Sequence, residues 1–203
     1  ELLGIDIVIP DFSYLRENAD RIVGVFLTHG HADAIGALPY FLNEFNVPVF
    51  GSELTIELAK IQLQKDPKAK NFNDFHIINE KTEIDFGTVT VSFFRTTHSI
   101  PDSMGIVLQT SAGEVVYTGD FKFDPTAAGD YQTDFARLAE IGSKGVLALL
   151  SDSANAENYE QPVSEREIAA YVLETFKYHP GRIIVVSFAS HIFRIQQVLD
   201  AAA

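Results

Sequence analysis

The apolar run Ile22–Leu27 leads straight into residues 28–38, which read Thr-His-Gly-His-Ala-Asp-Ala-Ile-Gly-Ala-Leu. An apolar run of this length, followed at once by polar residues, predicts a buried strand that ends in a loop. That loop carries His29, His31 and Asp33 at alternate positions, so it can turn all three side chains towards one point. Imidazole and carboxylate groups are ligands that zinc binds. The stretch therefore predicts a metal site at the end of a buried strand.

Further apolar runs predict strands along most of the chain, and periodic patterns predict helices between them. The predicted strands are Ile5–Ile9, Ile22–Leu27, Val47–Phe50, Phe75–Ile78, Val89–Phe94, Ile106–Thr110, Val115–Thr118, Val146–Leu150 and Ile183–Phe188. The predicted helices are Ile35–Phe45, Ser52–Lys65, Ser164–Tyr178 and Ser190–Ala203. Ser52 and Ser164 are the expected N-caps of two of them, and Ser164 with Glu167 has the spacing of a capping box.

The order of these elements indicates the fold class. Helices alternate with strands after residue 34, and paired strands fill the middle of the chain, so an α/β protein with layered αββα architecture is expected. The stretch Gly145–Asp152, the helix that follows it and the run Arg182–Phe188 have the βαβ rhythm of a second domain.

Composition excludes some classes of protein and of site. The 203 residues contain no cysteine, which excludes disulfides and thiolate zinc sites and fits a reducing cytoplasm. No apolar run approaches ~20 residues, so a soluble protein without a membrane-spanning helix is expected. The net charge of −13 argues against a general nucleic-acid binder, because phosphate binding depends on Lys and Arg. A bound divalent cation would change the sign of the charge locally.

Six blocks of the sequence resemble the ribonuclease J group of the β-CASP nucleases, which have the metallo-β-lactamase fold. The blocks are GIDIVIPDFSYLREN (4–18), LTHGHADAIGALPYFL (27–42), FRTTHSIPDSMGIVLQT (94–110), VVYTGDFKFD (115–124), LLSDSANAE (149–157) and SFASHIFRIQQVLDAA (187–202). They stand in the family's order and extend over essentially the whole chain. The resemblance implies a partial metallo-β-lactamase αββα sandwich over residues 1–152, followed by the start of a β-CASP α/β domain over residues 153–203.

The resemblance also implies roles for residues in these blocks. His29, His31 and His98 would bind a first metal ion, and Asp120 would bridge two metal ions. Asp33 would bind the second ion and orient the attacking water, which makes it the expected catalytic residue. Zinc is the expected metal, with manganese as the alternative.

Further positions either add to this pattern or depart from it. Asp152, which ends LLSD, matches an acidic residue that is expected to orient a metal-binding histidine. Ala34 stands where the family has a metal-binding histidine, and Ala32 stands where it usually has glutamate. The family's remaining motif residues would lie before Glu1 and after Ala203, so the chain is expected to be a piece of a longer protein. The second metal site is therefore expected to be weak or empty.

Each of these residues also has a purely structural interpretation. His29 and His31 could cap a helix or line a turn, and Asp33 could be a helix N-cap. His98 could be an ordinary surface histidine, and Asp120 could cap the loop after a strand. The grouping of the first three at one strand end, together with the matching blocks around the other two, favours metal binding.

The resemblance implies a metal-dependent RNA phosphodiester hydrolase, endonucleolytic or 5′-to-3′ exonucleolytic, that acts in RNA processing and decay in the cytoplasm. The missing ligand at position 34 indicates weak activity, as in the less active of two paralogues that works with its active sibling. The expected partners are RNA and a homo- or hetero-oligomer with that sibling, and no membrane partner is expected. Two alternatives stay open: a noncatalytic scaffold or RNA-binding subunit, and a fully active metallohydrolase with another group in place of residue 34.

Overall fold

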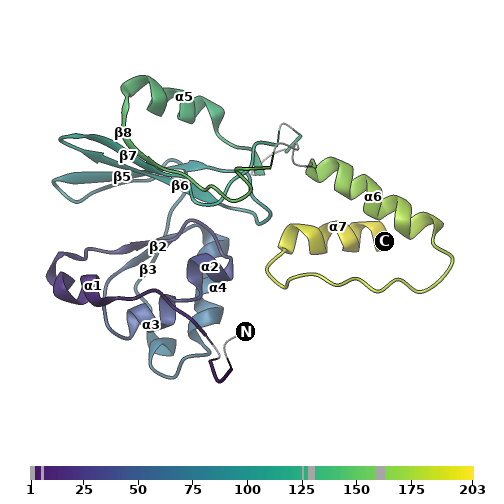
Figure 1. Cartoon of the computed structure of the whole chain (residues 1–203), viewed down its shortest axis with the longest axis horizontal. Coiled ribbons are helices and arrows are strands. Elements are labelled where there is room, and N and C mark those ends of the chain that lie inside the picture. The colour runs from purple at the N-terminus through teal and green to yellow at the C-terminus, as the bar shows by residue number, and fades with distance from the viewer. Residues whose placement is uncertain (1–2, 6, 125, 128–130, 159–162) are drawn as a thin grey trace.

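The computed structural model describes residues 3–5, 7–124, 126–127, 131–158 and 163–203, and it contains two β-sheets with helices on their outer sides (Figure 1). The strands are β1 (Val25–Phe26), β2 (Val49–Gly51), β3 (Phe75–Ile77), β4 (Glu83–Asp85), β5 (Val89–Arg95), β6 (Met104–Thr110), β7 (Gly113–Tyr117) and β8 (Val146–Leu150). The α-helices are α1 (Ser13–Glu17), α2 (Ala32–Ile35), α3 (Leu38–Leu42), α4 (Glu53–Leu63), α5 (Phe135–Lys144), α6 (Glu165–Tyr178) and α7 (Ile192–Ala202). Two short 3-10 helices are η1 (Ala19–Arg21) and η2 (Ala69–Asn71).

The two sheets differ in strand direction. The first has the order β1-β2-β3, and its strands are parallel. The second has the order β4-β5-β6-β7-β8, with antiparallel pairs as far as β7 and a parallel pair between β7 and β8. Parallel neighbours need a crossover connection, which α4 supplies between β2 and β3 and α5 supplies between β7 and β8. The loops after β1 and after β7 therefore leave the carboxyl ends of parallel strands, where functional side chains often lie.

Three apolar clusters confirm the expected αββα layers. The first lies between the first sheet and its helices and contains Ile56 of α4. The second lies between the two sheets and contains Phe50 and Phe93. The third lies between the second sheet and α5 and contains Phe94 and Ile141. Phe93 and Phe94 are neighbours in β5, so successive side chains of this strand supply the clusters on its two opposite faces.

Two of the predicted strands are wrong. Ile183–Phe188 has no strand partner among the described residues, and its side chains face solvent, with Ile184 82% and Val186 92% exposed. β-branched residues form a strand only where a neighbouring strand pairs with them, so the expected βαβ unit lacks its second strand here. In the predicted strand Ile5–Ile9, residues 5 and 7–9 have no regular structure, and residue 6 lies outside the described residues.

The predicted helix Ile35–Phe45 is two short helices, α2 and α3. Pro39 has no N–H to donate to the carbonyl of Ile35, so a continuous helix would lose a hydrogen bond at this point. The chain makes the break at Gly36 and begins α3 just before Pro39.

One of the two predicted N-caps is confirmed and the other is not. The capping box of Ser164 and Glu167 is confirmed at the start of α6. Ser52 does precede α4, but its hydroxyl donates to Thr55 Oγ1 at 2.8 Å and caps no backbone N–H. Helix α5 was not predicted; the Asp134 side chain caps it by accepting the N–H of Arg137.

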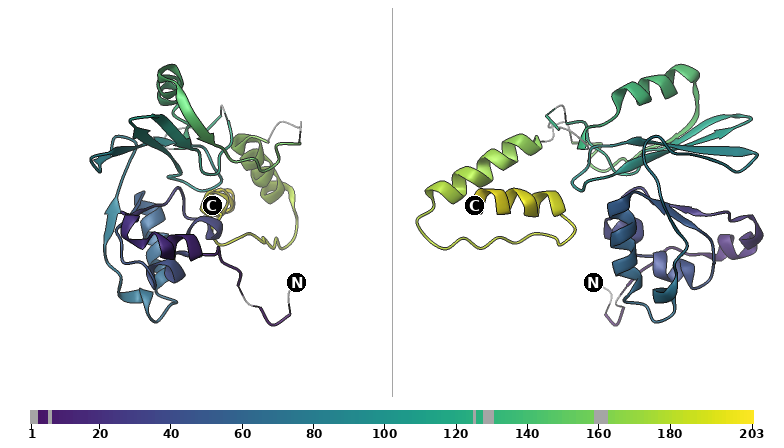
Figure 2. Two further views of the ribbon diagram at one scale, coloured as in Figure 1. Left: turned by 60° about the vertical axis from the view of Figure 1, so that its left-hand side comes forward. Right: turned by 180° about the vertical axis from the view of Figure 1, so that it is seen from behind.

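Helices α6 and α7 lie side by side and extend away from the two sheets (Figure 2). Asp124 connects them to the second sheet, because its buried carboxylate accepts the N–H of Glu165 at 2.9 Å. The domain boundary near residue 152 stays a prediction. In the part of the chain that the structure describes, no helix is long and apolar enough to cross a membrane.

Candidate metal centre

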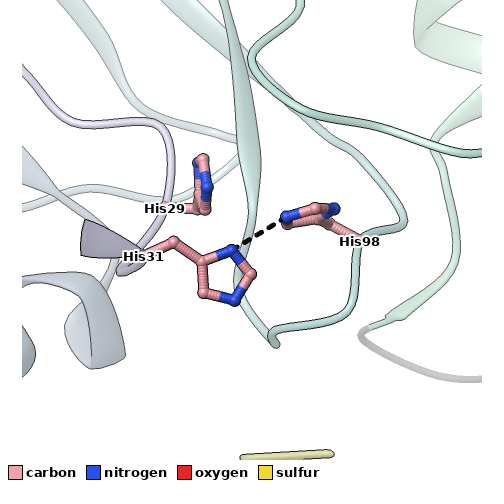
Figure 3. Close-up of side chains that lie close together, drawn as sticks. All are labelled: His29, His31 and His98. Atoms are coloured by element: carbon pink, nitrogen blue, oxygen red, sulfur yellow. Dashed lines mark hydrogen bonds between the residues drawn. The ribbon is translucent and has the colours of Figure 1, made fainter. Parts of the chain in front are cut away.

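The predicted ligands come from loops of both sheets and lie next to one another. His29 and His31 are on the loop between β1 and α2, His98 is on the loop between β5 and β6, and Asp120 follows β7. Figure 3 shows the imidazoles of His29, His31 and His98 grouped around one point. Their ring centroids are 4.8–4.9 Å apart in each pair.

Distances between donor atoms confirm that these side chains converge. His98 Nε2 lies 3.0 Å from His31 Nδ1, and Asp120 Oδ2 lies 3.7 Å from both His29 Nε2 and His98 Nε2. Asp33 Oδ2 is 4.0 Å from His29 Nε2. Two donors bound tetrahedrally to one zinc ion are about 3.4 Å apart. The spacing is thus close to that of a metal site, while the role of each residue as a ligand stays a prediction.

Burial keeps the imidazoles of the site neutral, which is the protonation state in which they bind a cation. It is the main reason why the pKa values of His29 and His98 fall from 6.5 to about 4, with the neighbouring imidazoles adding to the shift. Burial also lowers the pKa of His31. A neutral imidazole has the lone pair that a metal needs. Burial and then the charge of Asp33 raise the pKa of Asp120, so a cation between the two carboxylates would relieve their repulsion.

One buried atom tests whether the residues fit a metal. His29 is 2% exposed, and its Nε2 has no hydrogen-bond partner among the described residues. Its other ring nitrogen, Nδ1, lies 3.0 Å from Thr28 Oγ1. The tautomer with a proton on Nδ1 donates to Thr28 and leaves the Nε2 lone pair facing Asp120. A buried acceptor without a partner is costly, and a cation would remove that cost, so the donor set fits a divalent metal.

Thr28 holds the loops of the two sheets together beneath the site. Its carbonyl accepts the N–H of Met104 at 2.8 Å, which joins the loop after β1 to β6. Gly119 packs on it from the loop after β7; a Cβ on Gly119 would lie 2.9 Å from Thr28 Cβ, and the φ of +59° there also favours glycine. Thr28 therefore positions both His29 and the Asp120 loop. The sequence analysis gave it no role, although its place directly before His29 was a signal.

Asp33 and Ala34 face different surroundings at the start of α2. Asp33 lies in the first turn, its side chain is 65% exposed, and the N-cap position belongs to His31. The interpretation of Asp33 as an N-cap is therefore wrong. Ala34 is half-buried and packs against the cluster beneath the first sheet. Position 34 thus contributes an apolar contact and no donor atom.

The charge of Asp152 adds to the rise in the pKa of the Asp120 carboxyl, after burial and the charge of Asp33. Its own carboxylate accepts the N–H of Ala154 at 2.8 Å, and its N–H donates to Thr118 Oγ1 at 3.0 Å. Within the described ranges, no hydrogen bond joins Asp152 to a histidine. Its expected role in orienting a histidine stays a prediction.

His191, to which the sequence analysis assigned no role, lies beside the site. Its ring centroid is 6.0 Å from that of His31. The residue precedes α7, so the last helix of the chain begins next to the histidine group. No local signal in the sequence could indicate a contact between positions so far apart.

The low pKa values of His29 and His98 predict how stability without metal depends on pH. Between about pH 6.5 and pH 4, the unfolded chain binds protons at these imidazoles and the folded chain does not. The free energy of unfolding should therefore decrease as the pH falls through this range, by up to about 1.4 kcal/mol per pH unit for each imidazole, and level off below it. Urea unfolding in the presence of a chelator measures this, with His98→Gln as the comparison. An equal slope in both proteins would show that His98 is not buried in its neutral form.

Comparisons with known proteins agree with this geometry. A family model described as the metallo-beta-lactamase superfamily matches residues 4–162. Ribonuclease J 2 of Streptococcus pyogenes serotype M3 is 57% identical over 202 residues, and ribonuclease J 2 of Staphylococcus aureus strain NCTC 8325 is 48% identical over 206 residues. Both matches cover 100% of this chain and 36% of the relative, so the chain spans about a third of the length of these curated relatives.

A solved structure shows the same fold. The crystal structure of a protein of unknown function from Enterococcus faecalis V583 superposes with a TM-score of 0.65 at 17% sequence identity. The match covers 87% of this chain and 44% of that one. At this level of identity the similarity concerns the fold alone.

Proposed function

Because this chain belongs to the metallo-beta-lactamase superfamily, we propose that the protein hydrolyses phosphodiester bonds of RNA with the help of bound divalent metal ions. The observation that carries the proposal is the convergence of three imidazoles and the Asp120 carboxylate at one edge of the two sheets. The similarity to ribonuclease J 2 over the whole chain supports RNA as the substrate. Processing and decay of RNA in the cytoplasm are part of this proposal.

His29, His31, His98 and Asp120 would hold the first cation, which we propose to be zinc, with manganese as the alternative. When bound, such an ion stabilises negative charge on a phosphoryl group and lowers the pKa of a water molecule. The low pKa values of His29 and His98 mean that no proton has to leave these side chains before the cation binds at pH 7.

The other residues of the site would act on the water and on the ligands. The exposed carboxylate of Asp33, 4.0 Å from His29 Nε2, would orient an attacking water and accept its proton. With its proton on Nδ1, His29 would donate to the hydroxyl of Thr28, which would fix the orientation of the ring. Thr28 also contacts Met104 of β6 and Gly119 in the loop after β7. These contacts would keep His29 and Asp120 at their separation.

We propose that a second cation binds weakly. Asp33, Asp120 and His29 form a second group of possible ligands, but His29 and Asp120 would both also hold the first cation. Ala34 faces the apolar cluster beneath the first sheet and offers no donor. Two-metal stabilisation of an in-line displacement needs both cations, so weak hydrolysis is the expected consequence.

Replacing Ala34 by histidine together with Ala32 by glutamate is expected to increase affinity for a second cation and RNA hydrolysis by about tenfold or more. The new imidazole follows Asp33 directly and can turn from the apolar cluster towards that carboxylate. Metal titration and cleavage of a 5′-monophosphorylated RNA by the full-length protein measure the two effects. Ala37→His, which adds an imidazole to a half-buried position farther along the chain, is the control. A second bound metal with no gain in rate would show that position 34 does not limit the enzyme.

The same feature of Ala34 supports a second candidate function. A protein with a weak second metal position could act chiefly as an RNA-binding or scaffolding subunit in a hetero-oligomer with an active sibling. The two functions differ in one measurement, which is RNA cleavage by the full-length protein alone and with that sibling, with and without a chelator. Chelator-sensitive cleavage by the protein alone supports the hydrolase. Cleavage only in the presence of the sibling, unaffected by substitution of His98, supports the subunit.

A further inference from the structure

A cavity of about 430 Å³ lies between the β5–β6 loop and the helices α6 and α7. His98 and Thr97 line one side of it, so it borders the metal centre directly. The α7 side is formed by residues 193, 196, 197 and 200, whose spacing places them on one face of that helix. Its volume is within the range of about 300–1,000 Å³ that is usual for sites of small ligands.

Hydrogen bonds fix the walls of this cavity. The hydroxyl of Thr97 donates to the carbonyl of Tyr131 at 2.7 Å, and Thr97 and Thr133 exchange two further bonds of 3.0 Å between hydroxyl and backbone N–H. On the opposite side, Gln197 Nε2 donates to the carbonyl of Glu165 at 3.1 Å, which joins α7 to α6. Because both walls are tied down, the cavity is built before a ligand arrives, which reduces the entropy lost on binding.

The lining chemistry suits a flat and uncharged group with hydrogen-bond donors. The rings of Tyr131 and Phe193 meet with their centroids 4.6 Å apart and form an aromatic wall. Gln196 Nε2 donates to Asp200 Oδ1 at 2.7 Å, and the carboxylate retains further acceptor positions. The lining also contains the carboxylate of Glu165 and the guanidinium of Arg166, so its two carboxylates outnumber its one cation and do not favour a phosphate. Aromatic faces stack on bases, and a carboxylate accepts a hydrogen bond from the N4 amino group of cytosine.

We propose that this cavity binds a nucleobase with an exocyclic amino group, on the nucleotide beside the phosphate that is hydrolysed. The inference rests on the proposed function, because it takes RNA as the substrate and the histidine group as the reacting centre. The base stacks on Tyr131 and Phe193, and its amino group donates to Asp200. His98 borders the same cavity, so a base held there places its own backbone phosphate next to the metal ligands.

Cytidine and uridine form a matched pair for the test, because they present an amino group and a carbonyl at the same ring position. The full-length protein is titrated with pairs of RNAs that differ only by C or U at one position, and this position is moved along the RNA from pair to pair. A chelator is present to prevent cleavage. Fluorescence anisotropy gives each dissociation constant. At one position, wild type should bind the cytidine RNA about tenfold more tightly, and Asp200→Asn should reduce that difference to about twofold or less. Glu174→Gln, the same charge change at an exposed position of α6, should leave it unchanged.

A second pair of variants tests the cavity itself by filling it. Ala169→Leu places a larger side chain in the cavity. It should weaken binding of every RNA about tenfold, which is the loss typical of one stacked base. Ala170→Leu adds the same side chain at the next, exposed position, outside the cavity, and should have no effect. The melting temperature of each variant shows that it is folded.

The outcomes separate the inference from the proposed function. If wild type binds and cleaves RNA, but shows no cytidine preference and the same affinity as Ala169→Leu, the inference is overturned and the hydrolase stands. If wild type neither binds nor cleaves any RNA, both are overturned. If Ala169→Leu alone weakens binding and no position distinguishes cytidine from uridine, the role of Asp200 in recognising an amino group is overturned.

Discussion

Replacing His98 by alanine is expected to weaken binding of the first metal ion by more than about 100-fold and to abolish RNA hydrolysis by the full-length protein. His98 Nε2 lies 3.0 Å from His31 Nδ1 and 3.7 Å from Asp120 Oδ2, so its removal takes one donor from the centre of the proposed site. Loss of a group behind a ligand already costs about 10–100-fold in affinity, and loss of a ligand should cost more. Metal titration by calorimetry and cleavage of a labelled RNA measure the two effects.

His76→Ala is the matched control for this experiment. His76 lies on β3, and its side chain is 50% exposed and paired with Asp74 at 2.9 Å. Removing it takes away an imidazole without touching the proposed site, so metal affinity and cleavage should stay at the wild-type level. Wild-type metal affinity in a folded His98→Ala protein would contradict the assignment of His98 as a ligand.

Replacing Gly105 by alanine is expected to lower the free energy of unfolding by about 3 kcal/mol. Gly105 pairs with Phe94 across β5 and β6, and a Cβ at this position would overlap the ring of Phe94. That ring cannot move aside easily, because it is 1% exposed and packed in the cluster beneath α5. The same two strands flank the loop that carries His98, so the substitution should also loosen the metal centre.

Urea unfolding of the Gly105→Ala protein measures this effect, and Gly142→Ala provides its control. Gly142 lies in α5, is exposed, and has no atom within 4 Å of the position of an added Cβ. Alanine should stabilise the helix there by up to about 1 kcal/mol. The two substitutions add the same methyl group and should change stability in opposite directions. Equal effects would show that the overlap with Phe94 does not determine the cost.

Local sequence patterns predicted the helices and strands whose conformation depends mainly on their own residues. The strand Val89–Phe94 and the capping box of Ser164 appear in the structure as predicted, although β5 is buried on both faces. Partners that lie far along the chain decide the rest. Ile183–Phe188 has every local feature of a strand and no neighbour to pair with among the described residues. Strand β4 was missed because Ile84 is its only apolar side chain, between Glu83 and Asp85, and no local pattern indicates its pairing with β5.

In the candidate site, too, local patterns predicted only some of the residues. The pattern His29, His31 and Asp33 at the end of a buried strand was enough to predict a group of possible ligands from one loop. His98 and Asp120 join it only because the second sheet packs on the first, and without the family resemblance no spacing in the sequence indicates that contact. Thr28 directly precedes His29 in the sequence, yet its contacts with Met104 of β6 and with Gly119 could not be inferred from a single sequence.

Metal content and turnover of the full-length protein test the central claim most directly. The zinc and manganese content of the purified protein is quantified. RNA hydrolysis is then measured with the protein as purified, after chelation, and after zinc or manganese is added back. We expect one tightly bound metal ion per chain, lost in His98→Ala, and weak hydrolysis that chelation removes and metal restores. A protein that holds no metal would contradict the proposed centre. Two tightly bound ions with rapid hydrolysis would contradict the weak second position inferred from Ala34.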